Sequence, residues 1–112
     1  MAAQTRGAHH IGLTVPDLSA TKNFFINTLG YDQVGEVPDY PAVFVSDGTI
    51  WITLWQAQNP ENAVAFDRRN NIGLHHFALM VENHQALDGL NEQLQNTDDV
   101  EIEFAPESLG GG

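Results

Sequence analysis

Two short segments of the chain, residues 8–15 and 74–81, share one pattern of large and small side chains. Each contains a pair of histidines followed by an apolar run in which bulky side chains occupy every second position. Because side chains alternate between the two faces of a β-strand, each segment predicts a strand with one bulky face and one smaller face. The smaller face carries His10 in the first segment, and His76 and Met80 in the second. The shared alternation indicates an internal repeat whose strands present a histidine to one concave surface.

After the first histidine segment, the sequence predicts one helix and three strands. Asp17 is a typical N-cap residue, and Gly30 stands where a left-handed residue would end the helix. The alternating apolar stretches that follow predict strands over residues 31–37, 42–46 and 49–56. The order β-α-β-β-β over residues 8–56 is therefore interpreted as a first module.

The remainder of the chain predicts a shorter version of the same module. Residues 57–73 contain Pro, Asn, Asp and Arg with little apolar periodicity, which is typical of a connector. The second histidine segment is followed by a helix pattern that begins at Asn83 and by an alternating pattern over residues 100–105. Residues 74–112 thus predict β-α-β, without the last two strands of the first module, and residues 1–112 together predict a single domain.

The composition limits the classes of function. Fifteen acidic residues against four basic ones give a formal net charge of −11, which disfavours nucleic acid and anionic membrane surfaces as partners. The absence of cysteine excludes disulfides, a thiolate nucleophile and thiolate metal ligands. Because no apolar run reaches membrane length and the first residues lack the apolar core of a secretory signal, we expect a soluble cytoplasmic protein.

Candidate pocket residues lie on the predicted strand over residues 49–56. Its alternation places Trp51, Thr53 and Trp55 on one face, opposite the aliphatic face. The two tryptophans either fill the core or form the wall of an apolar pocket with indole N–H donors, and the pattern leaves both interpretations open. Phe44 belongs to the same wall if its strand turns it toward that face, and we expect Met80 to join from the second module.

The sequence of the first strand and helix resembles a known superfamily. The phrase His-His-Ile-Gly-Leu-Thr-Val-Pro-Asp-Leu at residues 9–18 is followed by Phe-Phe-x-x-x-Leu-Gly-Tyr at residues 24–31. Together they resemble the vicinal oxygen chelate superfamily, which includes glyoxalase I, extradiol dioxygenases and bleomycin resistance proteins. The resemblance implies an α+β fold of paired βαβββ modules, in which a curved mixed sheet surrounds a cavity.

The same resemblance implies a divalent metal, Zn, Ni, Mn or Fe, with His10 and His76 at the positions of its histidine ligands. The family's enzymes usually take a carboxylate from a run such as Ile-Glu-Leu, but Thr53 occupies that position here. A second carboxylate would lie beyond Gly112 in the family pattern. Zinc and related metals bind through three or four protein ligands, so two imidazoles and a hydroxyl form a weak set.

Two functions follow from the resemblance. The first is a glyoxalase-like, metal-dependent lyase or isomerase, or a dioxygenase-type enzyme, that acts on a small oxygenated substrate; its catalytic base is not identified. The alternative is a metal-free protein, resembling the bleomycin resistance proteins, that binds and sequesters a small apolar or cationic molecule. Since the incomplete second module would leave a sheet edge unpaired, we expect either a chain that continues beyond Gly112 or a homodimer.

Overall fold

The computed structural model describes residues 2–107. The chain divides into two compact units, Met1–Val64 and Ala65–Gly112, which are described separately below as the N-terminal and C-terminal units. The division falls inside the segment that the sequence predicts as a connector.

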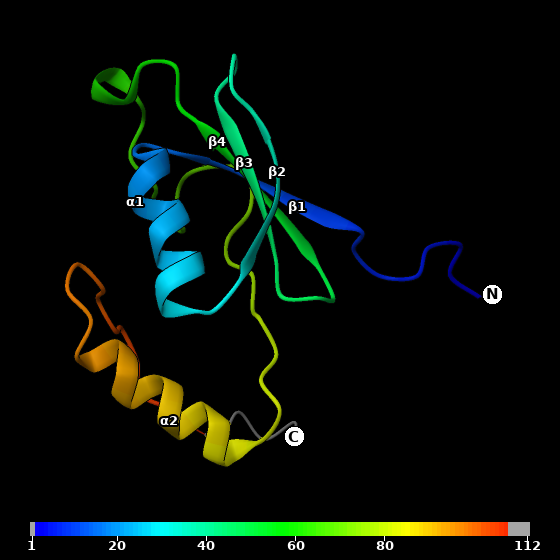
Figure 1. Cartoon of the computed structure of the whole chain (residues 1–112), viewed down its shortest axis with the longest axis vertical. Coiled ribbons are helices and arrows are strands. Elements are labelled where there is room, and N and C mark those ends of the chain that lie inside the picture. Colours follow the sequence, from blue (N-terminus) through cyan, green and yellow to red (C-terminus); the bar gives the residue numbers. More distant parts are fainter. Residues whose placement is uncertain (1, 108–112) are drawn as a thin grey trace. The chain divides into compact units, whose positions relative to one another are not determined.

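The N-terminal unit is a four-stranded mixed sheet with a helix against one face (Figure 1). The outer strand β1 pairs in parallel with β4, whereas β4–β3 and β3–β2 are antiparallel. Across the sheet the strands are β1 (His10–Val15), β4 (Trp51–Gln56), β3 (Ala42–Ser46) and β2 (Asp32–Val37). The predicted α+β class and the β-α-β-β-β order of the first module are confirmed.

The predicted helix forms as α1 (Leu18–Asn23) and continues into a π-helical turn, η1 (Phe24–Thr28). Asp17 is the N-cap, since its Oδ1 accepts a hydrogen bond of 3.1 Å from the backbone N–H of Ala20. The helical region ends before Gly30, whose φ of 78° is the left-handed conformation that glycine adopts without strain. Both boundary predictions are confirmed.

The hydrophobic core lies between α1 and the aliphatic face of the sheet. Val45, Ile52 and Leu54 are fully buried there, and Phe25 from η1 is 5% exposed. Burial of each such side chain stabilises the fold by roughly 1.5–3 kcal/mol. Because the aliphatic side chains of β4 are committed to this core, the alternate side chains of the strand must lie on the other face.

Over its described residues, 65–107, the C-terminal unit contains one regular element, the helix α2 (His84–Gln95). Asn83 caps it, as predicted, because its Oδ1 accepts a hydrogen bond of 2.8 Å from the backbone N–H of Ala86. A short 3₁₀ turn, η2 (Pro60–Asn62), precedes this unit in the chain. None of the helices among residues 2–107 is long and apolar enough to cross a membrane.

Two predicted strands of the C-terminal unit are wrong, because residues 74–81 and 100–105 form no strand in the structure. In the N-terminal unit, β1 pairs only with β4, the last strand of the module. A second module of the same design needs its own fourth strand before its first strand can pair, and no strand occurs among residues 65–107. A backbone without a ladder partner does not become a strand, whatever the alternation of its side chains.

Candidate functional site

The face of the sheet opposite α1 carries the predicted pocket residues of the N-terminal unit. The parallel register of β1 and β4 puts His10 beside Trp51, and the antiparallel register of β3 and β4 puts Phe44 beside Thr53. Paired residues in a sheet point to the same face, so these four side chains and Trp55 share one surface. The expectation that Phe44 turns toward the two tryptophans agrees with this register.

Four rings on this surface form a continuous cluster, which we call the aromatic face: Tyr40, Phe44, Trp51 and Trp55. The ring centroids lie 4.5 Å apart for Tyr40–Trp55, 5.8 Å for Phe44–Trp55 and 6.4 Å for Phe44–Trp51. Tyr40 and Trp51, at the two ends of the cluster, are 50% and 44% exposed. The aromatic face therefore presents large apolar surfaces to the outside and does not serve only as core.

Thr53 lies below these rings and is 8% exposed. Its Oγ1 accepts a hydrogen bond of 2.9 Å from the indole Nε1–H of Trp55 and lies 3.4 Å from the carbonyl oxygen of Ile11, to which it donates. A Cβ on the neighbouring Gly12 would lie 3.0 Å from the same Oγ1, so glycine makes room for the hydroxyl. Thr53, which stands where the resemblance implies a carboxylate, thus has a hydroxyl that is hydrogen-bonded within the protein. This hydroxyl holds the Trp55 side chain in place.

The two candidate metal ligands belong to different units. His10 is exposed at the start of β1, and its Nδ1 lies 2.9 Å from the Nδ1 of His9. His76 is exposed in the C-terminal unit, with its Nδ1 2.8 Å from that of His75. Met80, the predicted pocket residue of the second segment, is 95% exposed and lies outside any strand.

The donor set of the N-terminal unit does not fit a divalent metal. The side of the sheet that carries the aromatic face offers one imidazole, from His10, and the hydroxyl of Thr53, which is already hydrogen-bonded. Among residues 2–107, the structure assembles no group of three His, Asp or Glu side chains. Metal sites of the kind that the resemblance implies need three or more such ligands.

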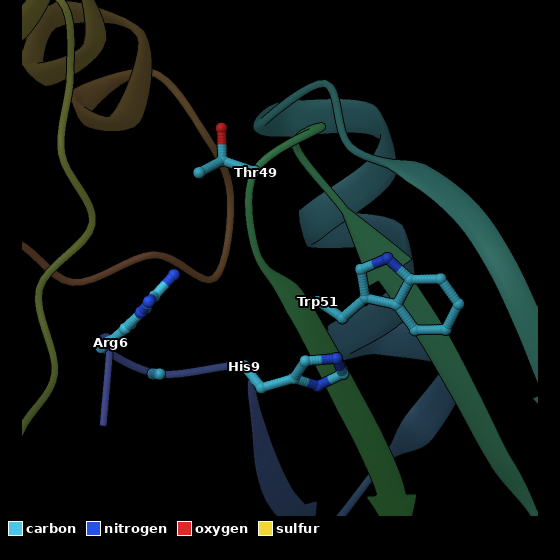
Figure 2. A pocket seen from close by; sticks show the side chains of 6 residues that line it. Arg6, His9, Thr49 and Trp51 are labelled. Atoms are coloured by element: carbon cyan, nitrogen blue, oxygen red, sulfur yellow. The ribbon is translucent and has the colours of Figure 1, made fainter. Parts of the chain in front are cut away.

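A hollow of about 760 Å³ adjoins the aromatic face at the starts of β1 and β4 (Figure 2). Trp51 belongs to both features. The lining residues are Arg6, Gly7, Ala8, His9, Thr49 and Trp51. Sequence reasoning missed Arg6, His9 and Thr49, and the available signal was that one of only four basic residues stands three positions before a histidine pair.

The turn between β3 and β4 positions Thr49 and Trp51. Asp47 fixes this turn through its Oδ1, which accepts hydrogen bonds from the backbone N–H groups of Thr49 (2.8 Å) and Ile50 (2.9 Å). The bond from Ile50, and then that from Thr49, hold the pKa of the Asp47 carboxyl below its usual value. Burial and the nearby Asp47 raise the pKa of Tyr31. The turn is therefore held by an ionised carboxylate whose lone pairs are used locally.

Several solved structures have the same fold as this chain, and some of them are described as glyoxalases or as lactoylglutathione lyase. An integron cassette protein from the mobile metagenome of the Halifax Harbour sewage outfall has a TM-score of 0.60 at 17% identity, covering 82% of this chain and 71% of that one. Lactoylglutathione lyase from Agrobacterium tumefaciens has a TM-score of 0.58 at 20% identity, covering 84% and 72%. A protein from Bacillus cereus described as a possible glyoxalase has a TM-score of 0.59 at 19% identity, covering 82% and 74%. At these identities the likeness shows the fold alone.

Among curated proteins, no sequence matches the chain. A family model, in contrast, matches residues 7–112, which include both histidine segments and the aromatic face. The match extends over nearly the full length of the chain, and the βαβββ order of the N-terminal unit agrees with it. The chain belongs to the Glyoxalase/Bleomycin resistance protein/Dioxygenase superfamily.

Proposed function

We propose that the aromatic face binds a small molecule with a flat apolar body, and that the protein holds this compound without a metal. The observation that carries the proposal is the pair of half-exposed rings, Trp51 and Tyr40, at the two ends of a cluster with a buried, hydrogen-bonded Thr53 beneath it. Such a surface stacks against a planar ligand and provides no ionised group to react with it.

The position of Thr53 supports binding over catalysis. Metal-dependent members of the superfamily are expected to use a carboxylate here, as a ligand or as a proton carrier. A threonine hydroxyl neither ionises near neutral pH nor serves as a general base, and this hydroxyl already bonds to Trp55 and Ile11. We therefore place the protein nearer to the sequestering branch of its superfamily than to the lyases.

Trp51→Ala is expected to weaken binding of a flat uncharged probe, naphthamide, by about tenfold, because the variant removes the most exposed tryptophan surface of the face. The measurement is an NMR titration that follows the indole N–H signals, which arise from only two tryptophans. In the unmodified protein both signals should shift with one dissociation constant. In the variant, the Trp55 signal should shift only at higher probe concentration.

Phe66→Ala is the matched control, since Phe66 is an aromatic residue of the C-terminal unit and is 68% exposed. It should bind naphthamide as the unmodified protein does. If Phe66→Ala weakens binding as much as Trp51→Ala, the probe is adsorbing to exposed aromatic surface in general. That result, or the absence of any indole shift, would contradict the proposed site.

A metal-dependent lyase or isomerase is the second candidate, and the position of His10 favours it. The registers place His10 beside Trp51 on the face that also holds Thr53. Its Nδ1 faces His9, so a ligand would meet the ring through Nε2. This candidate predicts that His10→Ala lowers the affinity for Ni²⁺, measured by calorimetry, by at least about tenfold, as loss of one protein ligand does.

The histidine at the start of α2 provides the control for the metal experiment. His84→Ala removes an exposed imidazole that no motif associates with the site. Equal Ni²⁺ affinity in the two variants would mean that His10 binds no metal. The metal-dependent candidate would then be rejected, while the binding function would stand.

A further inference from the structure

We infer that the ligand of the aromatic face carries an anionic oxygen group, of the carboxylate type, and that Arg6 binds this group in the hollow beside Trp51. The inference rests on the proposed function, because the hollow and the aromatic face share the Trp51 ring. The inference adds to the proposed function the charge of the ligand and the orientation of the ligand on the sheet.

Within the part of the chain that the structure describes, Arg6 is a cation without an acidic partner. Among residues 2–107, the one salt bridge in the structure joins Arg68 and Glu103, so Arg6 takes part in none. The chain has fifteen acidic residues and only four basic ones, so positive charge available to an external anion is scarce. An uncommitted guanidinium that lines a hollow is therefore available to an external anion.

Two neighbouring groups in the hollow complement the guanidinium. Thr49 lines the hollow, and because its backbone N–H is already bonded to Asp47, its side-chain hydroxyl is the donor that remains. His9, which immediately precedes β1, adds an imidazole (Figure 2). The nearest acid in the turn, Asp47, has its Oδ1 engaged by two backbone N–H groups, which offset part of its negative charge.

The geometry of the aromatic face sets the orientation of the ligand. Trp51 lines the hollow on one side and lies 6.4 Å from the Phe44 ring on the other, measured between ring centroids. A ligand whose anionic group is bound by Arg6 would place its flat body over Trp51 and toward Phe44. The net charge of −11 repels anions at long range, but salt at about 0.15 M screens this repulsion beyond about 8 Å.

The test uses three probes with one flat body: naphthoate, uncharged naphthamide and cationic naphthylmethylammonium. Dissociation constants come from the same indole NMR titration at about 0.15 M salt. Naphthoate should bind about threefold to tenfold more tightly than naphthamide, the range expected for a charge-assisted bond that stays partly in water. The cationic probe should bind most weakly of the three.

Arg6→Gln should reduce the preference for naphthoate over naphthamide to about onefold, because the guanidinium is its source. Lys22→Gln is the matched control, since it removes one positive charge from α1, which lies against the other face of the sheet. The preference for naphthoate should persist in this variant.

Equal affinities for naphthoate and naphthamide in the unmodified protein would overturn the inference while leaving the proposed function intact. Persistence of the preference in Arg6→Gln would overturn it as well. If none of the three probes shifts the Trp51 signal, both the inference and the proposed function fail.

Discussion

Leu54→Ala is expected to lower the free energy of unfolding of the N-terminal unit by about 3–5 kcal/mol. Leu54 is fully buried at the centre of the sheet, in register with Leu13 of β1 and Val43 of β3, and it lies on the face that packs against α1. Truncation to alanine removes apolar contacts and leaves a cavity that the two neighbouring strands cannot close. Urea unfolding followed by tryptophan fluorescence measures the change, because both tryptophans lie on β4.

Ile72→Ala is the control for this experiment. Ile72 is an aliphatic residue of the C-terminal unit and is fully exposed, so its truncation should change stability by less than about 0.5 kcal/mol. Similar losses in the two variants would mean that the aliphatic face of β4 is not the core of the unit. The assignment of Trp51, Thr53 and Trp55 to the opposite face would fail with it, because the two faces follow from one alternation.

Thr53→Glu, which restores the residue type typical of the superfamily's enzymes, is expected to destabilise the N-terminal unit by about 3 kcal/mol at neutral pH. The position is 8% exposed, and the aromatic rings around it offer a carboxylate little compensation. The substitution also removes the hydroxyl that accepts the bond from Trp55 and fills the space beside Gly12. The same unfolding experiment measures this effect.

Thr53→Ser keeps the Oγ1 atom and should cost no more than about 1 kcal/mol. A glutamate variant as stable as the serine variant would show that the position is hydrated or adaptable. The surface beneath the rings would then tolerate an ionised group, and the argument that this face binds without a metal would lose its main support. The serine variant measures the loss of the threonine methyl group alone, whereas the glutamate variant combines the loss of the hydroxyl with the introduction of a charge.

The parts of the fold that depend on local sequence could be predicted. Side chains two positions apart in a strand point to the same face, so the alternation over β4 was enough to predict that Trp51 and Thr53 share a face. The caps Asp17 and Asn83 were equally readable, since an N-cap hydrogen bond spans only a few residues.

The parts that depend on a distant partner could not be predicted. Residues 74–81 have the alternation of a strand, but a strand also needs a neighbour, and the equivalent of β4 does not occur among residues 65–107. The hollow likewise depends on the path of the chain around Arg6 and on the β1–β4 register, which brings Thr49 near His9. Neither the path of the chain around Arg6 nor the β1–β4 register follows from the local alternation of side chains.

The measurement that tests the central claim most directly is the set of intermolecular NOEs between naphthoate and the protein. The account predicts NOEs from the naphthalene protons to the rings of Trp51 and Phe44, and from the proton beside the carboxylate to the side chain of Arg6. NOEs confined to residues 65–107, or none to either Trp51 or Phe44 at saturation, would contradict a binding site on the aromatic face.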